Sequence, residues 1–318
     1  MGERARIARY FAPLAAPEAG SLSLTDDAAL LTLPADHALV VTTDSVIQSV
    51  HVLAEATPQH FAQKLMRRNL SDLAAMGATP WRYTLNLHTP NGLPDDWFAE
   101  FAASLEAEQK RFNMVLIGGD STSAPNAPIH ATMTCFGLIQ GTHLSRSGAK
   151  AGDDVYVSGS IGDAALGLFI LQKKLGGSET LVTRYHLPEP RLGLGVALRG
   201  IATAAIDVSD GLLSDAAQLC AASKVGAHLD RTAIPLSPSA AALLKQHPEL
   251  LSLALDGGDD YELCFTAPAS AREAIMRLAS ELKVPVTRIG VVTEEKQMLL
   301  TDAAGNPLPL PDLGYEHR

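Results

Sequence analysis

The chain has 318 residues, a formal net charge of −10, and an apolar fraction of 47% with only 5% aromatic residues. This length predicts two domains, each able to bury its own core, and the composition is that of an ordered α/β protein. The negative charge, together with the absence of any run of more than two basic residues, excludes nucleic acid as a partner.

The N-terminal segment, MGERARIARYFAPLA, is charged and amphipathic, and it lacks an apolar stretch long enough for a secretory signal or a membrane span. The three cysteines, Cys135, Cys220 and Cys264, lie far apart in apolar stretches. This spacing predicts buried thiols and no disulfide or zinc framework. We therefore expect a cytoplasmic protein with no membrane partner.

In the first half, short apolar runs predict strands at 38–43, 114–117 and 129–139. Helical patterns begin at about Pro58 and after Pro94. These elements indicate an α/β or α+β layer. Turn-rich residues between Ser145 and Gly152 mark the domain boundary, and the predicted domains are 1–147 and 148–318.

The second half opens with a strand at 154–158 and a helix that extends through Leu171. Further helices are expected at 190–203, 211–223, 237–246 and 269–282, and further strands near 227–230, 260–266 and 286–292.

Aspartates recur beside Gly, Ser or Thr in five short motifs: Asp26-Asp27, Asp44, Asp72, Asp120, and the pair Asp207 and Asp210. Several of them follow directly on an apolar run, where a strand end meets solvent. So many like charges in one place would repel strongly unless cations lay between them. The set therefore predicts Mg²⁺, together with a phosphate chain.

Each motif also has an ordinary structural explanation, as a turn or as the solvated face of a helix. The segment Asp207-Val-Ser-Asp-Gly211 is the most specific, because a cap needs only one aspartate. Its place between a strand and a helix predicts backbone N–H groups that attract anions and carboxylates that hold cations. The acidic segment 256–262 fits either a loop that grips a cation or polar substrate or a plain turn.

Two isolated residues have open alternatives. His51, between two valines, is either a packed structural residue or a functional one. Arg146 is either a linker charge or a phosphate ligand. The sequence contains no P-loop, no protein-kinase signature, no H-E-x-x-H and no G-x-S-x-G, and Gly193-Leu194-Gly195 is a poor dinucleotide fingerprint.

Taken together and in order, the motifs resemble those of the thiamine-monophosphate kinase family. The resemblance also includes Gly257-Gly258-Asp259-Asp260-Tyr261 and Gly314-Tyr315-Glu316-His317. The strand-to-aspartate elements alone would indicate only the wider aminoimidazole ribonucleotide synthetase superfamily. The resemblance implies a two-domain fold of that superfamily, with an N-terminal α/β domain that forms the sheet of a homodimer and a C-terminal α+β domain.

The implied activity is ATP-dependent phosphorylation of thiamine phosphate to thiamine diphosphate, the last step of thiamine diphosphate biosynthesis. Thiamine phosphate and ATP are the implied partners, with several Mg²⁺ ions. Direct in-line transfer is expected, because phosphoryl transfer needs positioning and charge neutralisation more than a protein nucleophile.

Carried over by position, the resemblance implies these site residues. The magnesium ligands are Asp27, Thr42, Thr43, Asp44, Asp72, Asp120, Asp207 and Asp210; nucleotide contacts are Gly119, Asp120, Arg146 and Ser209; substrate contacts are His51, Asp259 and Tyr315. Asp44, Asp120 and Asp210 are assigned to catalysis. The chain departs from the family pattern at Thr25, Ala102, Asp259 and Arg318.

Other members of the superfamily give the alternatives. Selenophosphate synthetase and the hydrogenase-maturation relative are excluded, because the chain has no Cys before Cys135 and ends in Arg318. Aminoimidazole ribonucleotide synthetase is the alternative enzyme. A nucleotide- or cation-binding regulator on the same fold is the alternative without catalysis.

Overall fold

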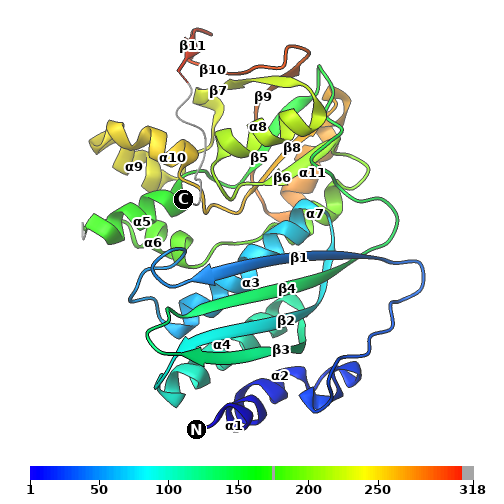
Figure 1. Ribbon diagram of the computed structural model, residues 1–318. Coiled ribbons are helices and arrows are strands. Elements are labelled where there is room, and N and C mark those ends of the chain that lie inside the picture. The colour runs from blue at the N-terminus through cyan, green and yellow to red at the C-terminus, as the bar shows by residue number, and fades with distance from the viewer. Residues whose placement is uncertain (174–175, 310–318) are drawn as a thin grey trace. The chain divides into compact units, whose positions relative to one another are not determined.

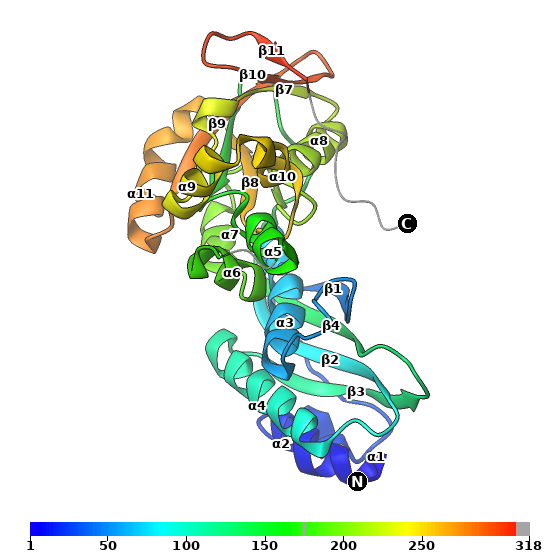
Figure 2. The same cartoon turned by 90° about the vertical axis from the view of Figure 1, so that its left-hand side faces the viewer.

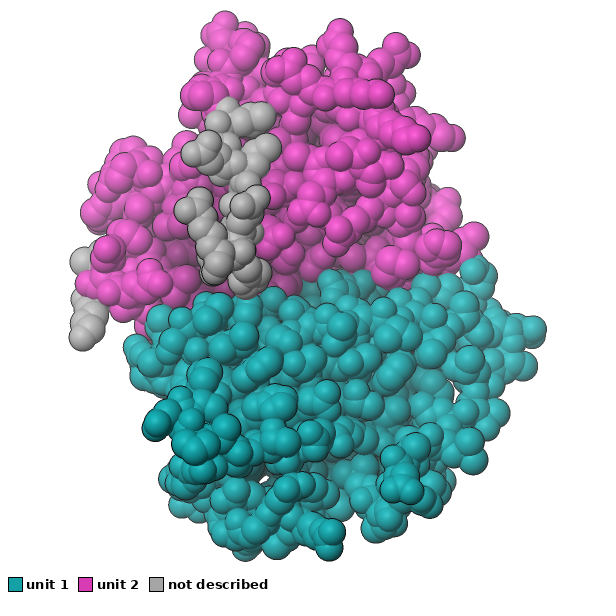
Figure 3. Space-filling view, in the orientation of Figure 1, with its two compact units in different colours: residues 1–73, 79–141 teal, residues 74–78, 142–318 magenta. Residues whose placement is uncertain are grey.

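The computed structural model describes residues 1–173 and 176–309. Its contacts divide the chain into two compact units, coloured in Figure 3. Unit 1 comprises residues 1–73 and 79–141, and unit 2 comprises residues 74–78 and 142–318. The predicted domain boundary after residue 147 stays a prediction, and Tyr315 and Arg318 lie outside the described residues.

Unit 1 is built on a four-stranded sheet with the order β1-β4-β2-β3, so β1 and β3 are its two edges. The strands are β1 (Ala38–Ile47), β2 (Thr79–Pro90), β3 (Val115–Ala124) and β4 (His130–Ile139). Strand β4 is antiparallel to both of its neighbours, and β2 is parallel to β3. The two edge strands therefore run in the same direction.

Helices α3 (Pro58–Ala75) and α4 (Asp95–Phe112) cover one face of this sheet (Figures 1 and 2). Burial alternates along β4, where Ala131, Met133 and Cys135 are buried against the helices. This period of two is what a sheet covered on one side requires. The other face of β4 is partly polar and half-buried.

Strand β2 is the one strand of unit 1 that the sequence analysis missed. Tyr83, Leu85 and Leu87 alternate along it and are buried. Pro80 and Pro90 lie near its two ends, where proline normally indicates a turn. The interior alternation is nevertheless that of a strand, and β2 lies between β4 and β3 in the sheet.

The N-terminal segment passes beside β3 (Figure 1) through short helical turns. These are α1 (Glu3–Arg6), a π-helical turn (Ile7–Phe11), α2 (Ala12–Ala15) and a 3₁₀ segment (Ala19–Leu24). Leu22, Ser23 and Leu24 have φ of 50°, 56° and 55°. Three consecutive left-handed residues without a glycine are costly. This strained turn leads directly into Asp26 and Asp27.

Unit 2 contains a seven-stranded sheet with the order β11-β10-β7-β9-β5-β8-β6. Its strands are β5 (Asp154–Ser158), β6 (Ala204–Asp207), β7 (Gly226–Asp230), β8 (Leu263–Ala267), β9 (Val286–Thr293), β10 (Met298–Thr301) and β11 (Pro307–Leu308). Its helices are α5 (Asp163–Lys173), α6 (Glu179–His186), α7 (Leu192–Leu198), α8 (Leu212–Ser223), α9 (Pro238–Gln246), α10 (Leu251–Asp256) and α11 (Arg272–Leu282). The mixed two-domain α/β and α+β class expected from the sequence is confirmed.

Several short elements of unit 2 were not predicted, namely α6, α10, β10 and β11. Segments of two to eight residues are too short to show a clear hydrophobic period. The longer predicted helices at 211–223, 237–246 and 269–282 are confirmed with shifted ends, whereas the one expected at 190–203 is shortened to Leu192–Leu198. Gly200 has a positive φ of 77° just after that shorter helix.

The three cysteines are free and buried, as predicted. Burial raises the pKa of each thiol, to about 11 for Cys220. They therefore behave as small apolar side chains. Within residues 1–173 and 176–309, no helix is both long and apolar enough to cross a membrane.

Candidate active site

The first group of predicted ligands lies where β1 faces α3. Thr42 and Asp44 are two residues apart on the strand, so their side chains share a face. The hydroxyl of Thr42 donates a hydrogen bond of 2.5 Å to Oδ2 of Asp72 on α3. Strand β1 and helix α3 thus bring together two of the predicted carboxylates and one hydroxyl. We call Thr42, Asp44 and Asp72 the β1 half-site.

Thr43 does not share this face. Its hydroxyl donates to the backbone carbonyl of Met133 at 3.2 Å and accepts from the hydroxyl of Thr134 at 3.1 Å, both on β4. Because side chains alternate along a strand, Thr43 points to the face opposite Thr42 and Asp44. The structure therefore does not bring the Thr43 hydroxyl into the β1 half-site.

Arg68 is a member of this region that the sequence analysis did not identify. Its guanidinium pairs bidentately with Asp44, with Nε to Oδ2 at 2.8 Å and Nη2 to Oδ1 at 3.1 Å. Arg68 stands four residues before Asp72 on α3, so both side chains face β1. That spacing was the available signal. Arg68 and a cation would compete for the same oxygens of Asp44.

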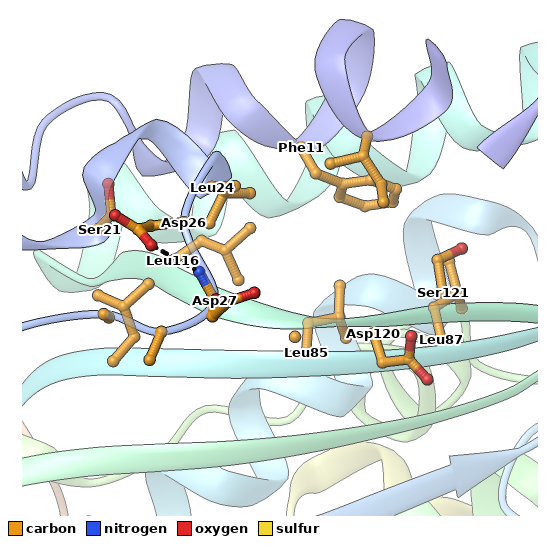
Figure 4. A pocket seen from close by; sticks show the side chains of 16 residues that line it. Phe11, Ser21, Leu24, Asp26, Asp27, Leu85, Leu87, Leu116, Asp120 and Ser121 are labelled. Carbon is orange, nitrogen blue, oxygen red and sulfur yellow. Dashed lines mark hydrogen bonds between the residues drawn. The ribbon is translucent and has the colours of Figure 1, made fainter. Parts of the chain in front are cut away.

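The second group lies at the opposite edge of the sheet. A cavity of about 160 Å³ is lined by Asp26, Asp27 and the segment Gly118–Ser121 of β3 (Figure 4). Apart from Ser21, its remaining wall is apolar and includes Phe11, Leu24, Leu85, Leu87 and Leu116. We call Asp27, Gly119 and Asp120 the β3 half-site. An acidic rim beside apolar walls suits a ligand that carries both a charged and an aromatic part.

Gly119 is required by close packing of the backbone. Its φ is 153°, and a Cβ atom at this position would lie 1.8 Å from the carbonyl oxygen of Leu85. Only glycine lets β3 approach β2 this closely. The neighbouring Asp120 is exposed at the rim of the cavity.

The two half-sites are far apart within the chain. Asp44 pairs with Met133, Met133 with Leu85, and Leu85 with Gly119, so one row across the sheet joins them. Three strand spacings separate Asp44 from Gly119 by about 14 Å. Among the residues that the structure describes, no three carboxylate, imidazole or thiol groups converge to hold a metal ion.

In unit 2, β6 leads into the loop Asp207–Gly211, as the sequence predicts, and α8 follows it. The loop's backbone N–H groups, however, are not directed at an external anion. Ser209, Asp210 and Gly211 donate to Oδ2 of Asp215 at 3.0, 3.0 and 3.2 Å. The predicted anion-binding N–H groups are therefore present, but the group that they bind is a buried carboxyl of α8 in the same chain.

Burial raises the pKa of Asp215 to about 7, and the charges of Asp207 and Asp210 add to the rise, while the backbone donors lower it. Asp215 is 2% exposed. It was not predicted, because an aspartate in the first turn of a helix is an ordinary feature.

The acidic loop 256–262 has divided roles. Asp260 is buried and accepts from the N–H of Gly162 at 2.7 Å, and Glu262 forms a buried ion pair with Arg184 at 2.8 Å. Both are structural. Asp259 remains as a candidate ligand: it has a φ of 66°, and its N–H donates to the carbonyl of Ser209 at 2.8 Å. The structure thus joins the Asp259 and Asp207–Gly211 segments.

The remaining predicted contacts are His51 and Arg146. Nδ1 of His51 accepts from the N–H of Ile47 at 3.1 Å, so this ring holds the end of β1. Arg146 is exposed, and its Nη1 donates to Oε1 of Gln218 on α8 at 3.3 Å. Tyr315 lies outside the described residues.

The chain matches two family models, AIR synthase related protein, N-terminal domain, over residues 25–139 and AIR synthase related protein, C-terminal domain, over residues 150–302. It is 40% identical to thiamine-monophosphate kinase of Escherichia coli (strain K12), over 99% of this chain and 98% of that protein.

Solved structures are similar as well. Thiamine-monophosphate kinase from Stenotrophomonas maltophilia K279a is 38% identical, with a TM-score of 0.83 over 92% of this chain and 96% of that one. AaThiL complexed with AMPPCP and TMP is 26% identical, with a TM-score of 0.78 over 92% of this chain and 91% of that one.

Proposed function

The chain belongs to the thiamine-monophosphate kinase family, and on this premise we propose that it transfers the γ-phosphate of ATP to thiamine phosphate. The products are thiamine diphosphate and ADP. Identity at 40% to a named kinase over nearly the whole chain is the observation that carries the proposal. Similarity to AaThiL complexed with AMPPCP and TMP, over 92% of this chain, supports an ATP-dependent reaction.

The donor set suits Mg²⁺, because carboxylate and hydroxyl oxygens are the hard ligands this ion prefers. Thr42, Asp44 and Asp72 of the β1 half-site, together with Asp27 and Asp120 of the β3 half-site, would hold the ions. Asp207 and Asp210 of unit 2 are the other proposed cation ligands, and Thr43 would contribute through its backbone. Bound Mg²⁺ neutralises the charge of the phosphates.

A homodimer resolves the separation of the half-sites. Strands β1 and β3 are the two edges of the described sheet, and Leu39 and Val41 of β1 are 40% and 55% exposed. An edge with exposed apolar residues invites pairing with another chain. We infer a two-fold dimer in which β1 of each protomer lies beside β3 of the partner.

The strand directions and register support this arrangement. The two edge strands run the same way, so a two-fold axis along the strands lets both edges meet in parallel. Rotation about that axis keeps each residue at its height, and Asp44 shares a row with Gly119. Gly119 of the partner subunit would then lie beside Asp44, and Asp120 of the partner subunit would lie one residue further along, beside Ser45.

The proposed step is direct in-line transfer. An oxygen of thiamine phosphate attacks the γ-phosphorus of ATP, the new P–O bond forms as the bond to the β-phosphate oxygen breaks, and ADP leaves. The attacking phosphate oxygen is already largely ionised near neutral pH, so no strong general base is required. Arg146 and Ser209 would bind the nucleotide, and His51 and Asp259 would bind the thiamine compound.

The decisive experiment is incubation with Mg·ATP and thiamine phosphate, followed by mass analysis for thiamine diphosphate. Its absence, with ATP hydrolysed or merely bound, would favour the alternative enzyme or the regulator. A phosphorylated protein, or retention of configuration at a chiral γ-phosphate, would contradict direct transfer. We also propose a cytoplasmic location, since the free thiols of Cys135, Cys220 and Cys264 suit a reducing compartment.

A further inference from the structure

Helix α8 has polar contacts to two loops that the proposed reaction needs. Near its N-terminus, Asp215 accepts the N–H groups of Ser209, Asp210 and Gly211. These residues form the loop that carries Asp207 and Asp210. The carboxylate is buried, and an apolar side chain in its place would leave three N–H groups without an acceptor.

At its C-terminal residue, α8 holds the loop that carries Arg146. The hydroxyl of Ser223 donates to the carbonyl oxygen of Arg146 at 3.1 Å. The same hydroxyl accepts from the N–H groups of Gly148 and Ala149 at 3.2 and 3.1 Å. One side chain therefore fixes the backbone on both sides of Ser147.

Between these ends, Gln218 links the two groups of contacts. Its Nε2 donates to Oδ1 of Asp215 at 3.2 Å, and its Oε1 accepts from Nη1 of Arg146 at 3.3 Å. The 145–149 loop also pairs with β6, since Ala205 donates its N–H to the carbonyl of Ser145 at 2.8 Å. Both loops thus contact the same strand and the same helix.

From these contacts we propose that α8 sets the spacing between the cation-holding loop and Arg146, with Asp215 and Ser223 as positioning residues. This inference rests on the proposed function, in which Arg146 grips a phosphate and Asp207 and Asp210 hold cations. Neither Asp215 nor Ser223 touches the substrate. Each acts through the residue whose backbone it holds.

The first test is a double-mutant cycle on Ser223 and Arg146. Ser223→Ala should weaken binding of Mg·AMPPCP about fivefold, the effect of one lost hydrogen bond, and leave the KM for thiamine phosphate unchanged. In an Arg146→Ala background the same change should have no further effect, because the side chain that Ser223 positions is already absent. Ser223→Thr, which keeps the hydroxyl, should restore binding.

Ser178→Ala is the matched control, since Ser178 is a half-buried serine of unit 2 whose hydroxyl donates to the hydroxyl of Ser239 at 2.9 Å. It should leave nucleotide binding unchanged. If the losses of nucleotide affinity from Ser223→Ala and Arg146→Ala are additive, Ser223 is merely structural and the inference is wrong. The same holds if Ser223→Ala weakens the binding of both substrates equally.

The second test measures hydrogen exchange at the amides of residues 209–211. Asp215→Ala should speed exchange there while the buried strand β8 stays protected, and Asp215→Asn, which keeps one acceptor oxygen, should largely restore protection. Unchanged exchange in Asp215→Ala would overturn the role of Asp215. The Mg·AMPPCP binding cycle and the exchange measurement need no thiamine phosphate, so they can succeed even if the proposed phosphorylation fails; only the KM comparison depends on that reaction.

Discussion

Mixing two inactive variants gives the sharpest test of a site shared between protomers. Asp44→Asn removes a carboxylate from the β1 half-site, and Asp120→Asn removes one from the β3 half-site. Both substitutions keep the shape of the side chain. Each variant alone should lose at least about a hundredfold in turnover, because a cation ligand is lost from both sites of its dimer.

The turnover that should return when the two variants are mixed follows from the distance between the half-sites across the sheet. Asp44 is about 14 Å, or three strand spacings, from Gly119, the neighbour of Asp120, within one chain, so Asp44 and Asp120 cannot hold one ion there. In a mixed dimer, one site receives both substitutions and the other receives neither. Random re-assortment makes half of all dimers mixed, so about a quarter of the wild-type turnover per protomer should return.

The assay is formation of thiamine diphosphate after the two variants are unfolded and refolded together. A mixture of Asp44→Asn with Asp72→Asn is the matched control, because both changes fall in the β1 half-site and every site stays defective. If the Asp44→Asn and Asp120→Asn mixture is no more active than either variant alone, each site is built within one protomer and the inferred dimer is wrong.

Light scattering should give twice the 33.6 kDa mass of the chain at micromolar concentration, and the monomer mass would contradict the dimer. Arg68→Gln frees Asp44 from a partly exposed ion pair of about 1 kcal/mol. The Mg²⁺ concentration for half-maximal turnover should therefore fall by up to about fivefold. A rise in that concentration would mean that Arg68 helps to hold the cation ligands in place. Glu108→Gln leaves the guanidinium of Arg67 buried without its carboxylate, so denaturant unfolding should show a loss of about 3–5 kcal/mol; a loss below 1 kcal/mol would refute this. Hydrogen bonds from Arg272, and then Arg288, lower the pKa of Asp154 from 3.8 to about 2. A carboxyl group whose pKa is lowered in the folded state stabilises the fold fully at pH values above 3.8, and this stabilisation is lost as the pH falls toward 2. The difference in unfolding free energy between wild type and Asp154→Asn should therefore shrink over this pH range. A difference that stays constant with pH would refute the reasoning.

The sequence carried enough information for most of the fold. Periodicity placed α3, α4 and α8, and the Asp207–Gly211 junction was predicted between its strand and helix. Strand β2 was missed because the prolines near its ends outweighed its interior alternation. Local patterns of this kind report the conformation of a segment, and they do not report strand order.

Strand order is what the site depends on. The motifs of Asp44 and Asp120 have the same form in the sequence, and only the order β1-β4-β2-β3 shows that they lie at opposite edges. The sequence also did not reveal the residues that pair with the predicted ligands, because Asp215 and Arg68 resemble ordinary charged residues on helices. Asp260, in turn, belongs to a suggestive acidic loop but accepts backbone N–H groups inside the fold.

The internal carboxylate of Asp215 has a consequence for inhibitor design. In many phosphate-binding proteins a compact anion can dock directly on the backbone N–H groups before a helix. Here the N–H groups of Ser209, Asp210 and Gly211 already bind a carboxylate of the same chain. We therefore expect simple phosphate mimics to be weak against this loop, and compounds that carry a chelated divalent ion to be the more effective starting point.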